Sequence, residues 1–369
     1  MILITILAFI VIFSILVLVH EWGHFYFARR AGIKVEEFGI GLPPRAKAFY
    51  KDKKGTVYSL NWIPFGGYVR LYGEDSSDPK VLKAKNSFAS KSLLSRSAVI
   101  VAGVLMNFVL AWVLLSVILT IGMRPILVTQ SDIDNASAAG LIKVQDVLMV
   151  NEILPGSPLA GTDLKEEDLV TRINGKGVPA AADLSGMLQP GQPVVLSILR
   201  GEREGALTVV PDENGKLGFA VSNIPYVVFL KDLKYPFYKA PFEAIMEVGR
   251  LSRLTVNLLG NVVVSLVQKL TVPEEVTGPV GIAKLTYKFM QEGVVALMQF
   301  VALLSISLGV INIMPFPALD GGRFLFIIFE AVTRRRPNAK WETMIHGVGF
   351  VLLILLIFVV TWHDIVKMF

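Results

Sequence analysis

Two histidines and a glutamate near the start of the chain have the spacing of a metal-binding helix. The sequence reads His20-Glu21-Trp22-Gly23-His24 at the end of the first apolar run. Residues four apart lie on one helical face, so both imidazoles can hold one zinc ion, with Glu21 able to accept a proton from nearby water. The alternative is a structural histidine pair at a membrane interface. Ionisable residues are costly there and are usually functional, which favours the metal site.

A catalytic zinc site needs a third protein ligand and leaves its fourth position open. The chain has no cysteine and four histidines, so the third ligand is a histidine or a carboxylate. His363 lies beyond the last apolar run and His346 begins it. Between residues 312 and 322, two prolines and a glycine pair are expected to unwind the backbone around one carboxylate, Asp320. We predict Asp320 as the third ligand; the alternative role is a helix cap or turn.

The elements that must position these residues are membrane spans. Hydrophobic residues make up 53% of the 369 residues and charged residues only 18%, which is too apolar for a soluble protein. Four apolar runs are long enough to span, at about 2–19, 97–122, 294–313 and 346–362. The first run lacks the basic start and the cleavage site of a signal peptide, so we expect it to be retained. The predicted fold is a polytopic α-helical membrane protein.

The distribution of charge predicts how the spans are oriented. Residues 28–97 hold 14 Lys or Arg against 6 Asp or Glu, whereas residues 124–292 hold 16 against 19. The positive-inside rule places the first segment in the cytoplasm, and the second segment and both termini outside. This pattern explains the net charge of +6 without nucleic-acid binding. The first and third spans then run in parallel, so that His20, His24 and Asp320 reach similar depths.

Two further segments have recognisable patterns. Residues 126–223 alternate β-rich runs, such as 194–200 and 206–210, with turns such as Asn174-Gly175, and predict a small β-rich outer domain. Residues 241–269 predict one or two amphipathic helices, lying on the outer membrane face or packed against the spans; residues 277–282 then interrupt any helix.

In the cytoplasmic segment, residues 56–63 and 68–72 flank Pro64-Phe-Gly-Gly67 and predict a membrane-associated β-hairpin. Its edge is able to hold an unwound substrate by strand addition. The alternative is a plain cytoplasmic hairpin.

A resemblance to a known family rests on the zinc motif and on Phe38–Gly41, Ile63–Arg70, Gly103–Asn107, Gly278–Ile282 and Asn312–Gly322. In these segments the chain resembles the site-2 protease family of intramembrane zinc metalloproteases, specifically the bacterial regulator of sigma-E protease type. The resemblance implies that His20, His24 and Asp320 bind Zn2+ and that Glu21 is catalytic. It also implies that Asn312, Pro315 and Pro317 handle substrate, whereas Asn107 either does so or simply bonds a neighbouring helix.

The outer domain resembles the PDZ domains of bacterial proteases in residues 155–160 and 164–175. Only one PDZ domain is recognisable, whereas many related proteins of Gram-negative bacteria have two.

The predicted function is an intramembrane zinc metalloendopeptidase in the bacterial inner membrane. Its expected substrates are single-pass membrane proteins, such as anti-sigma factors or remnant signal peptides, after an upstream site-1 protease has shortened their outer domain. The alternatives are a catalytically silent PDZ-bearing scaffold and a cation transporter. The expected division is 1–27 (span one, zinc motif), 28–96 (cytoplasmic loop and hairpin), 97–123 (span two), 124–225 (extracytoplasmic PDZ domain), 226–293 (juxtamembrane helices), 294–345 (span three and third ligand) and 346–369 (span four).

Overall fold

The computed structural model describes residues 2–74, 78–178, 181, 184, 188–201, 203–269, 276–336 and 338–366. The chain forms two compact units. One consists of residues 1–123 and 234–369, and the other of residues 124–233.

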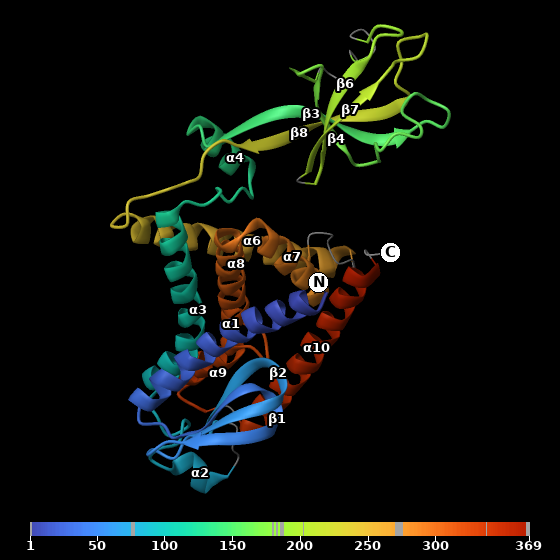
Figure 1. The fold of residues 1–369 in the computed structure, drawn as a ribbon. Helices are drawn as coiled ribbons and strands as arrows, with labels where there is room; N and C mark the ends of the chain where they lie inside the picture. Colours follow the sequence, from blue (N-terminus) through green and yellow to red (C-terminus); the bar gives the residue numbers. More distant parts are fainter. Residues whose placement is uncertain are drawn as a thin grey trace. The chain divides into compact units, whose positions relative to one another are not determined.

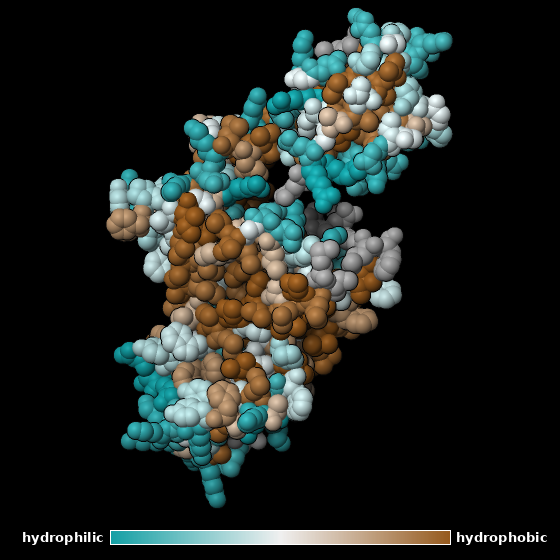
Figure 2. All heavy atoms as spheres, in the orientation of Figure 1, coloured by the Kyte–Doolittle hydropathy of each residue, from teal (hydrophilic) through white to brown (hydrophobic). Residues whose placement is uncertain are grey.

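Among the described residues, four helices of the first unit are long and apolar enough to cross a membrane, as the prediction of four spans requires. They are α1 (Ile2–Arg30), α3 (Leu93–Ile121), α8 (Val294–Ile313) and α10 (Ala339–Val366). Figure 2 shows hydrophobic residues gathered over this helical part and hydrophilic residues over the sheet beside it. The helix α1 continues past the apolar run through the zinc motif to Arg29 and Arg30, whose charges suit a helix C-terminus.

The helix α3 packs against both α1 and α8. Small residues allow these close contacts. A Cβ atom on Gly23 of α1 would lie 2.4 Å from the carbonyl oxygen of Ala102 in α3, so a side chain there would push the two helices apart. The packing therefore fixes the part of α1 that carries the zinc motif against α3.

Shorter or amphipathic helices complete the first unit. Residues 240–269 form a single helix, α6 (Ala240–Lys269). The sequence analysis predicted one or two helices here, so the first alternative is the one observed. The prediction that residues 277–282 interrupt any helix is partly wrong, because α7 (Pro279–Glu292) begins at Pro279, an allowed first helical position. The others are α2 (Pro79–Lys83) and α9 (Asp320–Thr333). The start of α1 and the end of α10 lie beside α7, at the end of the unit opposite the sheet (Figure 1).

Two long strands that follow α1, β1 (Val35–Lys51) and β2 (Val57–Leu71), form an antiparallel sheet. The predicted pairing of residues 56–63 with 68–72 is wrong. Phe38 of β1 pairs with both Tyr58 and Val69, so the first part of β1 lies between the two halves of β2. Gly39 allows this, since a Cβ atom there would lie 2.3 Å from Tyr68 and 2.7 Å from Asn61. The later half of β2 is consequently an edge of the sheet.

The second unit contains a six-stranded antiparallel sheet and the short helix α4 (Gln130–Ala138). Its strand order is β7-β6-β4-β3-β8, with β5 paired to β4. The predicted tight turn at Asn174-Gly175 is confirmed, because Ile173 pairs with Lys176 and both turn residues have positive φ. The apolar core includes Leu148, Val170 and Leu196. The strands are β3 (Ile142–Ile153), β4 (Leu169–Ile173), β5 (Lys176–Gly177), β6 (Val194–Arg200), β7 (Arg203–Val209) and β8 (Phe219–Phe229).

Candidate metal centre

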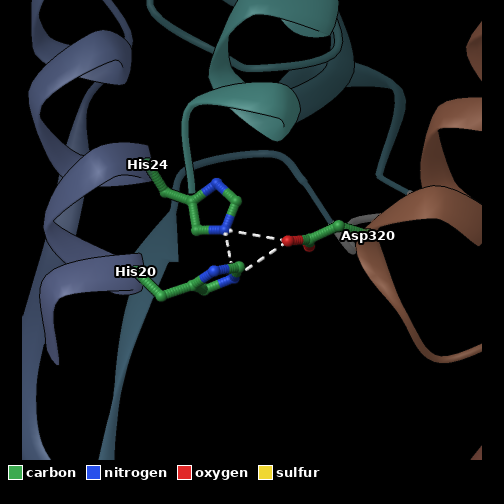
Figure 3. A group of neighbouring side chains, drawn as sticks. All are labelled: His20, His24 and Asp320. Atoms are coloured by element: carbon green, nitrogen blue, oxygen red, sulfur yellow. Dashed lines mark hydrogen bonds and ion pairs between the residues drawn. The ribbon is translucent and has the colours of Figure 1, made fainter. Parts of the chain in front are cut away.

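His20 and His24 of α1 meet Asp320 at the first residue of α9, as Figure 3 shows. Asp320 Oδ2 lies 2.9 Å from His20 Nε2 and 3.2 Å from His24 Nε2, and the two nitrogens are 3.1 Å apart. Both histidines are buried. In the part of the chain that the structure describes, no other group of three or more His, Asp or Glu side chains has this arrangement.

The triangle of ligand atoms fits a tetrahedral metal ion. Zinc–nitrogen and zinc–oxygen distances of about 2.0–2.2 Å separate neighbouring ligand atoms by about 3.3 Å at the tetrahedral angle. The observed distances of 2.9–3.2 Å are close to this value. A cation would stabilise two imidazole nitrogens and a carboxylate oxygen that lie this close together. The donor set of two nitrogens and one oxygen is typical of catalytic zinc.

Each imidazole is also oriented from its far side. His24 Nδ1 lies 2.8 Å from the carbonyl oxygen of Val99 in α3 and donates to it when Nε2 is the ligating atom. His20 Nδ1 lies 3.3 Å from the side-chain amide of Asn107, also in α3. A half turn of that amide brings Asn107 Oδ1, which has no other hydrogen-bond partner among the described residues, to accept from His20 Nδ1–H. Both contacts fix Nε2 as the ligating atom.

Of the two roles expected for Asn107, the bond to a neighbouring helix is the one that the structure contains, and the role in substrate handling stays a prediction. Its buried side chain does bind a neighbouring helix, and its partner on that helix is His20 itself. The structure places Asn107 behind a candidate ligand, which is a position that orients the imidazole.

Gly103 of α3 provides the space for the imidazoles. A Cβ atom on Gly103 would lie 2.3 Å from His24 Nε2 and 2.9 Å from His20 Cε1. The sequence analysis included this glycine only as part of the family resemblance and missed its role. The signal that was available is its spacing from Asn107, because residues four apart share a helical face.

Glu21 is held by the edge of the sheet. The backbone N–H of Val69 in β2 donates a hydrogen bond of 2.9 Å to Glu21 Oε2. Three residues earlier, Gly66 N–H donates to Ser14 Oγ at 3.2 Å, so this part of β2 runs beside α1. Sequence reasoning missed the contact with Val69, since a backbone group leaves no signal in side-chain types.

Asp320 is positioned by a sharp turn after α8. The glycine pair expected to unwind the backbone lies instead within the first turn of α9, where it permits close approach. A Cβ atom on Gly321 would lie 2.3 Å from the carbonyl oxygen of Ile313, and one on Gly322 the same distance from that of Phe316. The linker between α8 and α9 therefore folds tightly against the start of α9. This packing fixes the position of the Asp320 backbone, from which the carboxylate extends.

The structure brings some of the other candidate residues near this turn and separates others from it. Asn312 lies in the last turn of α8, whereas Pro315 and Pro317 lie in the linker that leads to Asp320. His346 is outside the ligand triangle and contacts the linker, where Ala318 N–H donates to its Nδ1 at 2.9 Å. His363 lies in the last turn of α10.

A His-His-Asp triangle with both histidines buried, beside a glutamate and in a protein with four apolar helices of membrane-spanning length, is typical of a membrane-embedded metallopeptidase. The chain belongs to peptidase family M50, whose model matches residues 8–356, and is an intramembrane protease of the site-2 type. It is 30% identical to the zinc metalloprotease RasP of Shouchella clausii, with 99% of both chains covered. It is 28% identical to the protease RseP of Yersinia pestis, with 97% of both chains covered. It is 32% identical to a putative zinc metalloprotease of Fusobacterium nucleatum, with 99% of both chains covered.

Proposed function

We propose that His20, His24 and Asp320 hold the catalytic zinc ion and that Glu21 is the general base. The observation that carries this proposal is the convergence of the three ligand atoms within 3.2 Å of one another in a family M50 chain. Zinc is the cofactor that suits this donor set, and zinc is named in relatives of the chain. The protein is a zinc metalloendopeptidase of the inner membrane, and the scaffold and transporter alternatives are set aside.

The residues of the site have three roles in this proposal: they bind the metal ion, transfer a proton, and orient the groups that do so. A zinc ion held in the triangle would supply Lewis-acid chemistry, because it would lower the pKa of water to about 7 and polarise a carbonyl group. Glu21 accepts the proton of the attacking water and passes it to the leaving amine. The Val69 N–H holds one carboxylate oxygen of Glu21 and so fixes the orientation of the base. Val99 and Asn107 hold the two imidazoles in their ligating orientation.

The later half of β2 is a suitable place for substrate. A transmembrane helix hides its peptide bonds in its own hydrogen bonds, so it must unwind before it is cut. An unwound strand gains backbone hydrogen bonds by adding to a sheet edge, and the edge around Val69 is the one in contact with Glu21. Asn312, Pro315 and Pro317 are further substrate-handling residues in this proposal, on the ground of the resemblance to the site-2 protease family; they lie at the end of α8 and in the linker that leads to Asp320. The substrates are single-pass membrane proteins, such as anti-sigma factors or remnant signal peptides, delivered by an upstream site-1 protease.

The second unit is a PDZ domain in this proposal, corresponding to the expected residues 124–225. Support comes from its antiparallel sheet and from a hollow of about 300 Å³ beside the first residues of β8. The hollow is lined mainly by apolar side chains, with Lys216 at a glycine-rich turn, which suits an extended peptide. Lining residues include Leu154, Leu184, Leu188, Leu217 and Val221. The charge distribution supports an extracytoplasmic position for this domain and for both termini, with the β1–β2 sheet in the cytoplasm.

Metal counting tests the ligand assignment. Each of the variants His20→Asn, His24→Asn and Asp320→Asn is expected to lose most bound zinc, whereas wild type binds one ion per chain. The control His363→Asn removes the histidine in the last turn of α10 and is expected to keep the ion. Stoichiometric zinc in all three ligand variants would overturn the assignment.

A further inference from the structure

The linker that carries Asp320, residues 314–319, is held by α10 at one specific point. Ala318 N–H donates a 2.9 Å hydrogen bond to His346 Nδ1. Ala318 has a φ of +76°, a left-handed conformation that is uncommon for a residue with a side chain. Such a conformation persists only where the surroundings hold it, and the bond from its own N–H is one such restraint.

A second contact from the same helical face supports the first. Gly349 follows His346 by three residues, so both face the linker. A Cβ atom on Gly349 would lie 2.3 Å from Pro317 Cβ and 2.6 Å from the Pro317 carbonyl oxygen. The backbone of α10 therefore approaches the linker so closely that no side chain fits between them, which places His346 within reach of Ala318.

Two hollows adjoin the linker. Ala318 and His346 line a cavity of about 810 Å³, and Pro317 lines another of about 600 Å³. Phe326 of α9 lines both, and its ring centre lies 5.4 Å from that of His346. The bond from Ala318 to His346 therefore adds a side-chain restraint to the backbone contacts that hold the linker, at the residue with the left-handed conformation.

The position of α10 is itself fixed at its opposite end. Asp364 accepts hydrogen bonds from Gly278 N–H at 3.1 Å and Gly281 N–H at 2.8 Å, around the first turn of α7. Between its two ends α10 is mostly exposed, as suits a helix that faces lipid. The contacts of Asp364 near one end of α10 and of Gly349 nearer the other end therefore set where this helix presents His346.

We propose that His346 is a positioning residue for the third zinc ligand. It accepts the Ala318 N–H, fixes the left-handed turn two residues before Asp320, and so places the Asp320 carboxylate at the distance that His20 and His24 require. It does not contact the metal ion. This inference rests on the proposed function, because it gives His346 a purpose only if Asp320 binds zinc.

Two polar substitutions separate this role from a general effect on folding. His346→Asn places a side-chain oxygen close to the position of Nδ1 and keeps the acceptor, whereas His346→Gln places its amide near Nε2 and loses it. Zinc affinity of the purified full-length protein, measured by chelator competition, is expected to fall 10–100-fold in His346→Gln, the usual effect of losing an outer hydrogen bond. It is expected to stay within a few-fold of wild type in His346→Asn. The control His363→Gln changes the other histidine of α10 and is expected to leave affinity unchanged.

A second readout needs neither metal nor activity. Hydrogen exchange of the Ala318 amide in zinc-free protein is expected to be faster in His346→Gln than in wild type, and close to wild type in His346→Asn. Equal zinc affinity and equal exchange in wild type and His346→Gln would overturn the inference while leaving the zinc site intact. If wild type binds no zinc, the proposed function fails first, and faster exchange in His346→Gln would then show only that the bond restrains the linker.

Discussion

Replacing Gly103 with alanine is expected to disable the metal centre by a single methyl group. The added Cβ would lie 2.3 Å from His24 Nε2, and ordinary contact needs at least 3.4 Å, so that nitrogen must move by about 1 Å. Metal–ligand distances tolerate about 0.2 Å, and a misplacement of about 1 Å at a reacting centre costs roughly 10²-fold in rate. The imidazole cannot easily swing aside, because Val99 holds its other nitrogen. Separation of α1 from α3 would break the close packing at Gly23.

The assay for Gly103→Ala compares zinc content and the rate of cleavage of a detergent-solubilised single-pass substrate. We expect zinc affinity to fall at least 10-fold and cleavage about 10²-fold. The matched control is Gly249→Ala on α6, where an added Cβ meets no atom within 4 Å and where alanine suits a helix better than glycine. Wild-type zinc affinity and cleavage in Gly103→Ala would refute the reasoning. Reduced thermal stability without loss of zinc would show that α1 and α3 move apart to make room for the methyl group, while the ligand atoms keep their positions.

Two further predictions concern the β1–β2 sheet. Val69→Pro removes the N–H that holds Glu21, so kcat is expected to fall about 10-fold or more with zinc content unchanged; an unchanged kcat would show that the bond has no catalytic role. Burial raises the pKa of the Glu37 carboxyl, but hydrogen bonds from Arg45 and Ser59 outweigh it and lower the pKa to about 2. The stability that Glu37 gives the sheet is therefore present above about pH 4.5 and lost as the pH falls towards 2. Hydrogen exchange across residues 35–71 checks this, and Glu37→Gln is expected to remove most of the dependence.

Periodicity and residue type were enough to predict the four apolar helices and the carboxylate that lies beside the two histidines. A run of apolar residues long enough for a bilayer has few alternatives, and the zinc motif needs a third donor in a chain without cysteine. Asp320 followed because it is the one carboxylate in a proline- and glycine-rich segment at a suitable depth. The structure brings it to both histidines.

The sequence pattern could not predict how the strands β1 and β2 pair. Pro64-Phe-Gly-Gly67 has the composition of a tight turn, but long-range pairing with Phe38 determines which strands are neighbours. Tertiary contacts of this kind override local turn signals. The close approach at Gly103 and the bond from Val69 were missed for a related reason, because each depends on where a backbone lies.

The most direct test of the central claim compares wild type with Glu21→Gln on a purified single-pass substrate that lacks its outer domain. Products are mapped by mass spectrometry and bound zinc is counted in both proteins. We expect one zinc ion in each protein, and cleavage within the hydrophobic segment by wild type alone, because a glutamine amide cannot accept the proton of water. Cleavage by Glu21→Gln at the wild-type rate, or absence of zinc from wild type, would contradict the account.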